Sequence, residues 1–72
     1  MSKADEMFLK TDFVNKEEII QKGKLTKIKY EDENCRYSII FNIISKEIRI
    51  NAVLNLKELQ AINEKCKELK WI

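Results

Sequence analysis

The last nineteen residues, with the sequence LNLKELQAINEKCKELKWI, predict a capped amphipathic helix. Asn55 is a favourable N-cap residue, and Glu58 follows three positions later, as it does in a capping box. Leu54 and Leu59 occupy the two positions of a hydrophobic staple, which packs the incoming chain against the first turn. We therefore expect the helix to begin at Leu56.

Apolar side chains recur along this predicted helix at intervals of three and four residues. They are Leu59, Ile62, Cys66, Leu69 and, at the end, Ile72. The spacing places them in one stripe on one side of the helix, so another element must cover the stripe. The chain has 72 residues, which we expect to form one domain, 1–72. Its core must be thin, because a domain of this size buries only about 60% of its unfolded surface.

Three earlier segments alternate between apolar and polar residues, which is typical of half-buried strands. They are 25–31, 35–42 and 47–52, and in the first of them Thr26, Ile28 and Tyr30 alternate with charged residues. Short connections between them favour an antiparallel meander with 35–42 in the middle.

The alternation assigns the two faces of this sheet. The face beneath the helix would carry the apolar residues Ile28, Tyr30, Tyr37, Ile39, Phe41, Ile48 and Ile50. The opposite, mostly polar face would carry Lys27, Lys29, Arg36, Ser38, Arg49 and Asn51, diluted by Glu31, Ile40 and Glu47.

The N-terminal sequence SKAD carries a second helix-start signature, with Ser2 as its N-cap. We expect a short helix over Ser2–Lys10, whose residues Ala4, Met7 and Phe8 contact the core. The expected fold is therefore α+β. It has a short N-terminal helix, a three- or four-stranded antiparallel meander and a C-terminal amphipathic helix packed on one face of the sheet.

Residues 13–24 fit two structures equally well. Asn15 as N-cap, Glu18 three residues later and Gly23 after the last turn would make a two-turn helix. In the other interpretation the segment is a strand that turns through Lys22 and Gly23 into the next strand, with glycine supplying a positive φ. Both interpretations stay open, and in both the chain reverses at Gly23, the only glycine.

Composition argues against several classes of function. Fourteen Lys and Arg against 12 Asp and Glu leave a net charge of +2, too small for a strong non-specific attraction to nucleic acid or anionic membranes. The chain has no histidine, and no spacing of its carboxylates, lysines or cysteines indicates a general base or nucleophile. One glycine cannot build a Gly-rich phosphate loop, and the acidic run 31–33 lacks the pattern of a calcium loop and resembles a solvated turn. We expect no enzymatic activity, no metal and no cofactor.

The two cysteines, Cys35 and Cys66, lack a CxxC spacing and histidine partners. In a reducing compartment such cysteines are small hydrophobic side chains, and we expect both to be buried rather than to form a disulfide or a metal site. The sequence shows no N-terminal apolar signal and no apolar run long enough to cross a bilayer. We therefore expect a cytoplasmic protein without membrane contact.

Two surfaces are candidates for binding. Trp71 and Ile72 either fold back onto the edge of the core or stay exposed as an anchor for a protein partner or a second copy, because Trp is common at binding hot spots. The polar sheet face offers an anionic partner four basic side chains: Lys27, Lys29, Arg36 and Arg49. Sheets that bind single strands also stack bases on exposed aromatic rings, which this face lacks, so nucleic acid is the less favoured partner.

Both ends of the chain resemble a family of small proteins encoded by phages and prophages of Gram-positive bacteria. The matching segments are SKADEMF at Ser2–Phe8 and ELQAINEKCKEL at Glu58–Leu69, followed by Trp71-Ile72. Similar proteins commonly have glycine before the Trp-Ile ending, where this chain has Lys70. That difference leaves open whether the helix stops there or continues through Trp71. The resemblance implies a protein of the bacterial host cytoplasm, with a task such as binding a host protein.

The function expected from the sequence is that of a non-catalytic phage or prophage accessory protein that acts by protein–protein binding. Its partner would be a host factor, a defence component or a second copy of the chain. The alternative is a nucleic-acid-binding regulator that uses the basic sheet face.

Overall fold

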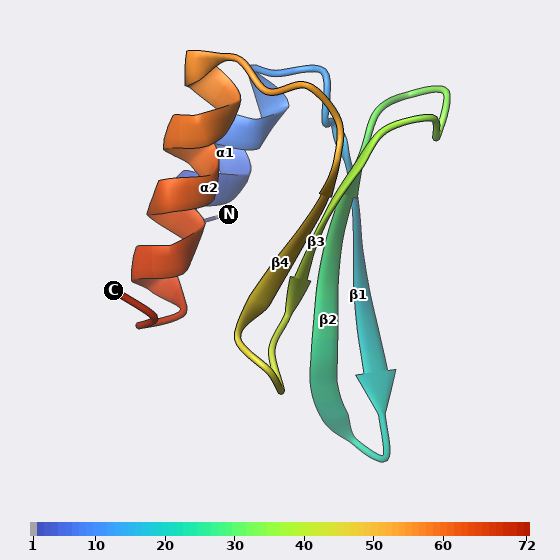
Figure 1. The fold of residues 1–72 in the computed structure, drawn as a ribbon. Helices are drawn as coiled ribbons and strands as arrows, with labels where there is room; N and C mark the ends of the chain where they lie inside the picture. Colours follow the sequence, from blue (N-terminus) through green and yellow to red (C-terminus); the bar gives the residue numbers. More distant parts are fainter. Residues whose placement is uncertain (1) are drawn as a thin grey trace.

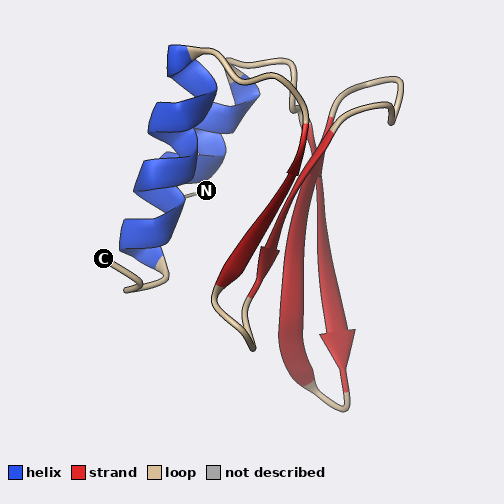
Figure 2. Cartoon of the chain, viewed as in Figure 1, coloured by secondary structure: helices blue, strands red, loops and turns tan. Residues whose placement is uncertain are grey.

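The computed structural model describes residues 2–72, which form a layer of two helices on a four-stranded sheet (Figure 1). The elements in chain order are α1 (Lys3–Leu9), β1 (Asn15–Gln21), β2 (Lys24–Glu31), β3 (Ser38–Asn42), β4 (Glu47–Asn51) and α2 (Leu56–Glu68). Each strand pairs antiparallel with the next one along the chain, and both helices lie on the same face of the sheet (Figure 2). The predicted α+β fold is confirmed, with four strands in the meander.

Residues 15–31 form a β-hairpin, so the helical interpretation of 13–24 is wrong. Gln21 pairs with Lys24 across a two-residue turn made by Lys22 and Gly23. Their φ angles of 52° and 76° are both positive, as a type I′ turn requires. This turn matches the right-handed twist of the flanking strands. Pairing along the whole of β2 therefore outweighs the local helix-start signal at Asn15.

A β-bulge interrupts the pairing of β1 with β2. Ile19 pairs with Lys27 whereas Ile20 pairs with Leu25, so Thr26 has no partner in β1. The extra residue reverses the alternation, and Leu25 packs against the core. The regular alternation predicted for 25–31 is therefore interrupted at Thr26 and holds from Lys27 onward.

The centre of the core is a group of three aromatic rings from three elements. Phe8 of α1 stacks on Tyr30 of β2, with ring centroids 3.9 Å apart and an interplanar angle of 16°. Phe41 of β3 meets both rings edge-on, at centroid distances of 6.4 and 5.9 Å. Burying such a side chain contributes roughly 1.5–3 kcal/mol. That is a large part of the roughly 5 kcal/mol at the lower end of the range for folded proteins.

The start of α2 is as predicted, but the side that it buries is not. The Asn55 side chain accepts a hydrogen bond from the backbone N–H of Glu58, and the Glu58 side chain accepts one from the backbone N–H of Asn55, which completes the capping box. The buried residues of the helix are Glu58, Ala61, Ile62, Lys65 and Cys66. Leu59, expected in the buried stripe, is 55% exposed. Glu58 and Lys65, two charged residues with partners inside the protein, take inner positions of the helix. Leu59 therefore lies on the outer side.

The helix ends at Glu68 in a Schellman motif. The backbone N–H of Trp71 donates to the carbonyl of Cys66 at 2.9 Å, and that of Lys70 donates to the carbonyl of Lys67 at 3.0 Å. Lys70 has a φ of 61° and takes the C′ position, where glycine is usual. The helix therefore stops before Trp71, although its C′ residue is a lysine.

Candidate functional site

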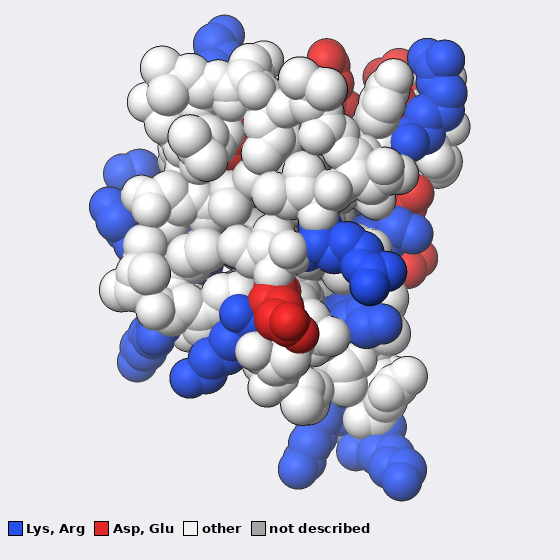
Figure 3. All heavy atoms as spheres, in the orientation of Figure 1, with Lys and Arg blue, Asp and Glu red and all other residues white. Residues whose placement is uncertain are grey.

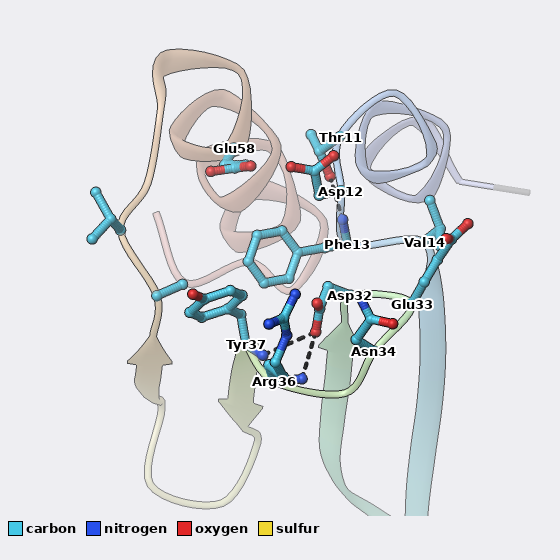
Figure 4. A pocket seen from close by; sticks show the side chains of 12 residues that line it. Thr11, Asp12, Phe13, Val14, Asp32, Glu33, Asn34, Arg36, Tyr37 and Glu58 are labelled. Carbon is cyan, nitrogen blue, oxygen red and sulfur yellow. Dashed lines mark hydrogen bonds between the residues drawn. The ribbon is translucent and has the colours of Figure 1, made fainter.

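Three connections meet at one end of the molecule, the upper end in Figure 1: α1–β1, β2–β3 and β4–α2. They surround a cavity of about 610 Å³. We call it the loop-end cavity and define it by Phe13, Arg36, Tyr37, Val53 and Glu58, with one or more from each connection or its flanking helix. Figure 4 shows the Phe13 ring in the middle, between Glu58 on one side and Tyr37 and Arg36 on the other.

The α1–β1 connection places Phe13 by a short set of hydrogen bonds. The hydroxyl of Thr11 donates to the carbonyl of Phe8 at 2.6 Å, and the backbone N–H of Phe13 donates to the Thr11 hydroxyl at 3.1 Å. These bonds turn the chain directly after α1. As a result Phe13 is buried among the core residues and also forms the inner wall of the cavity.

The β2–β3 connection is held by a buried carboxylate. Oδ1 of Asp32 accepts hydrogen bonds from the backbone N–H groups of Arg36 and Tyr37, at 2.7 and 2.9 Å. These bonds, that from Tyr37 most strongly, hold the pKa of Asp32 below its usual value despite burial. Asp32 is therefore a structural residue, and the predicted solvated turn over 31–33 is wrong at its central position.

Three predictions for residues 35–37 are also wrong, because these residues belong to the β2–β3 loop. β3 begins at Ser38, not at Cys35. Cys35 lies in the loop with a φ of 57° and is exposed, whereas we expected it to be buried. Tyr37, expected beneath the helix, is half exposed at the cavity, and the Arg36 guanidinium lies between its ring and the Asp32 carboxylate (Figure 4).

Exposed apolar side chains continue from the cavity onto the start of α2. Val53 is 96% exposed, Leu56 67% and Leu59 55%. We call these three residues the apolar rim. In the space-filling view, the surface over the first turns of α2 is largely free of charged side chains (Figure 3). Neither Leu56 nor Leu59 is needed to cap the helix, because the capping box uses Asn55 and Glu58.

A second group of titratable side chains, the ionic cluster, lies where the two helices meet the sheet; its Lys65 and Tyr30 are buried, whereas Lys16 and Glu68 are exposed. Asp5 accepts hydrogen bonds from Lys16 Nζ at 2.8 Å and from the Tyr30 hydroxyl at 2.6 Å. Lys65 Nζ lies 3.8 Å from Asp5 Oδ1 and 3.6 Å from Glu68 Oε1. Each charge of the cluster thus has an opposite charge beside it, which is the arrangement that makes buried ions tolerable.

The cluster changes the acidity of its members. Burial alone would raise the pKa of Asp5, but the hydrogen bonds from Lys16 and Tyr30 and the charge of Lys65 outweigh it, so that pKa lies below its usual value. Burial, and next the hydrogen bond to Asp5, raise the pKa of Tyr30 well above its usual value. Near neutral pH the carboxylate and the neutral phenol are therefore both stable, and the cluster joins α1 to β1, β2 and α2.

Three of the four predicted basic residues share the outer sheet face, and the fourth does not. Lys29 lies in one cross-strand row with Ile40 and Arg49, and Lys27 follows two residues from Lys29 on the same face. Lys27 and Arg49 border one hollow of about 250 Å³ on the outer sheet face, with Ile40 between them. Lys29 is paired with Glu31 at 3.5 Å, and Arg36 lies in the β2–β3 loop at the cavity. Neither α1 nor α2 covers this outer face, but acidic and basic side chains alternate across it. The positions of the basic and acidic side chains on the outer face therefore support a continuous anion-binding site less well than the sequence did.

Trp71 and Ile72, the other predicted pair, separate in the structure. The Trp71 ring is partly buried against the core, with its centroid 6.2 Å from that of Phe41. Ile72 is 73% exposed. Trp71 therefore folds back onto the edge of the core, as in the first of the two interpretations, and Ile72 remains on the surface.

Sequence reasoning did not find the loop-end cavity or the apolar rim. A signal was present at 52–56, where the run AVLNL departs from strand alternation and puts apolar residues at positions that neither a strand nor a helix would bury. The role of Asp32 has no comparable signal, because its partners are backbone groups that approach only once the loop has formed.

Comparisons with known protein families, with curated protein sequences and with solved structures find no match to this chain. Among residues 2–72, no group of three or more His, Cys, Asp or Glu side chains is placed to hold a metal ion. Neither α1 nor α2 is long and apolar enough to span a bilayer.

Proposed function

We propose that the protein acts without catalysis, by binding another protein through the loop-end surface, which we define as the loop-end cavity together with the apolar rim. The observation that carries this proposal is the exposure of Val53 at a cavity with aromatic walls and of Leu56 and Leu59 in the adjoining first turns of α2. Contiguous exposed apolar side chains with polar surroundings are typical of protein-binding sites.

The geometry of the surface suits a protein partner. The rim offers a broad apolar contact area, and the adjoining cavity offers Phe13 and Tyr37 to one projecting side chain. Hot spots of protein interfaces combine such a pocket with surrounding contacts that exclude water. The loop that presents Tyr37 is fixed by Asp32, so little conformational entropy would be lost on binding.

The resemblance of the chain ends to phage and prophage proteins adds a class of partner to the proposal. Under this proposal the partner is a protein of the bacterial host, such as a host factor or a defence component. A nucleic-acid-binding role is the alternative, and it would use Lys27 and Arg49 on the outer sheet face.

Affinity capture from a lysate of the bacterium that carries the gene tests the proposal, with and without nuclease. The wild type is compared with a Val53→Ser/Leu56→Gln variant. The matched control is Ile44→Ser, because Ile44 is 71% exposed in the β3–β4 turn at the opposite end of the molecule. Titration of the purified recovered protein then gives the Kd for each variant.

We expect the wild type and the control to recover the same protein after nuclease treatment, and the rim variant to lose it. Truncating a hot-spot residue costs about 2 kcal/mol or more, so the Kd should rise at least roughly 30-fold. Equal affinity of the rim variant would refute the assigned surface. Recovery of nucleic acid alone, lost in a Lys27→Ala/Arg49→Ala variant, would favour the alternative function.

A further inference from the structure

Among residues 2–72, β4 is an edge strand with no strand paired on its free side. The strand order is β1-β2-β3-β4, so β4 has a neighbour on one side, and four of its five residues are exposed. An open edge presents unpaired backbone N–H and C=O groups, which can pair with a strand of another chain. Its inner face carries Ile48, which packs against the core, and Ile50, which is 44% exposed.

The hydrogen bonds between β2 and β3 fix which backbone groups of β4 are free. The N–H of Ile43 donates to the carbonyl of Thr26, and the N–H of Asp32 donates to the carbonyl of Tyr37. In an antiparallel ladder the hydrogen-bonded pairs recur at every second residue. Phe41, two residues from Ile43, therefore also directs its backbone groups toward β2.

The neighbouring residues of β3 direct their backbone groups the other way, toward β4. Ile40 and Asn42 pair with Arg49 and Glu47, so these two residues of β4 use their backbone groups for β3. By the same alternation, Ile48 and its counterpart Ile50 direct their N–H and C=O groups toward the open side.

We propose that β4 pairs antiparallel with β4 of a second copy of this chain, about a two-fold axis at Ile48. Ile48 then exchanges both backbone hydrogen bonds with Ile48 of the second copy, and the two side chains meet on the inner face. Glu47 lies opposite Arg49 of the second copy, and Arg49 lies opposite Glu47. This isologous contact joins the two four-stranded sheets into one.

Charge complementarity selects this register. A two-fold axis at Arg49 would place two arginines opposite each other, which is destabilising. An axis at Ile50 would pair Arg49 with Asn51 and leave Glu47 without an opposite charge. The axis at Ile48 alone of these three gives two Glu–Arg pairs, and they fall at non-hydrogen-bonded positions, where side chains are closest.

The opposite edge of the sheet is less suited to the same contact. β1 carries Lys16 and Glu18 opposite Tyr30 and Ile28, so the inner side of its edge is charged rather than apolar, and Glu17 lies on the outer side. Charged edges of this kind prevent strand pairing.

The C-terminal tail packs on β3, the strand next to β4. Trp71 lies against Phe41, and Phe41 pairs with Ile48 at the proposed axis. The proposed contact does not involve the loop-end surface, so it can be tested independently of the proposed function.

Charge reversal tests both the dimer and its register. Sedimentation velocity and light scattering are measured from about 10 μM to about 1 mM for the wild type, Glu47→Arg, Arg49→Glu and the double variant Glu47→Arg/Arg49→Glu. The matched control is Glu17→Arg, which makes the same charge change on the β1 edge. Circular dichroism and the urea midpoint confirm that each variant is folded.

We expect the wild type and the control to have twice the mass of the 8.6 kDa chain. Each single reversal replaces both Glu–Arg pairs by like charges and should weaken dimerisation at least roughly tenfold, and the double variant should restore it. A wild type that remains monomeric at about 1 mM overturns the proposal. So does a dimer that is insensitive to the single reversals, or one that the double variant fails to restore.

Discussion

A Lys70→Gly variant should be more stable than a Lys70→Ala variant, because residue 70 occupies the C′ position of the Schellman motif with a φ of 61°. An L-residue in the left-handed conformation costs roughly 1–2 kcal/mol, which glycine avoids. Glycine in turn loses about 0.4–1 kcal/mol more backbone entropy on folding. The difference predicts a net gain of about 0.5–1 kcal/mol in the free energy of unfolding.

The charge of Lys70 must be separated from its backbone conformation. An ammonium group at a helix C-terminus stabilises by about 0.3–1 kcal/mol, and glycine removes it. Lys70→Ala removes the same charge but keeps a Cβ, so the comparison of the glycine variant with the alanine variant isolates the backbone effect. The predicted gain therefore applies to this pair of variants.

Urea and thermal unfolding, followed by the fluorescence of Trp71, provide the assay, because Trp71 is the only tryptophan and directly follows the site of change. The glycine variant should melt about 2–8 °C higher than the alanine variant. Lys67→Gly, inside the exposed last turn of α2, is the control and should lower stability by about 1 kcal/mol. If Lys70→Gly were no more stable than Lys70→Ala, the assignment of Lys70 to a strained C′ position would be refuted.

Three further predictions concern the titratable groups. Asp5→Asn should lower the free energy of unfolding by about 1.5–3 kcal/mol in urea denaturation, because Lys65, which is buried, loses one of its two carboxylate partners. The lowered pKa values of Asp5 and Asp32 stabilise the folded state above their usual value of 3.8, and this contribution is lost as pH falls through the folded-state values. The urea midpoint should therefore change little from pH 7 to about 5 and fall below about pH 4, less steeply in Asp5→Asn. A thiol reagent should modify Cys35 rapidly in the folded protein and Cys66 only after denaturation, because Cys66 is buried and burial raises its pKa.

Each of these measurements can contradict its prediction. An unfolding free energy of Asp5→Asn equal to that of the wild type would show that the Asp5 carboxylate does not stabilise the fold. If the urea midpoint fell equally steeply below about pH 4 in the wild type and in Asp5→Asn, Asp5 would not be a source of the acid dependence. Equal rates of modification at the two thiols would contradict the burial of Cys66.

The parts of the fold that depend on neighbours in sequence could be predicted from the sequence. The capping box at Asn55 needs only Glu58, three residues later. Alternation of apolar and polar residues over five to eight positions predicts the strands. The meander then follows from the short connections. Residues 13–24 carried local signals of both kinds, and only the long-range pairing with β2 decides between them.

The errors share a physical cause, which is dependence on partners far away in the chain. Leu59 faces outward because Lys65, on the inner side of α2, has its partner Asp5 in α1. The bulge at Thr26 is a property of the pair β1–β2 and of neither strand alone. The loop-end cavity likewise requires three connections to meet, so its residues carry no common pattern in the sequence.

The pairing of the two helices has a consequence for synthesis of the protein on the ribosome. The backbone N–H of Ala4 donates to Oε2 of Glu68, a residue 64 positions later. A helix of seven residues such as α1 is unstable in isolation, and its hydrogen bond to Glu68 can form only after the end of α2 has left the exit tunnel. Until then α2 does not cover the meander, and part of the apolar sheet face meets solvent or a chaperone. Completion of the fold is therefore delayed until translation has passed residue 68, and a ribosome that stalls earlier holds a chain with an open core.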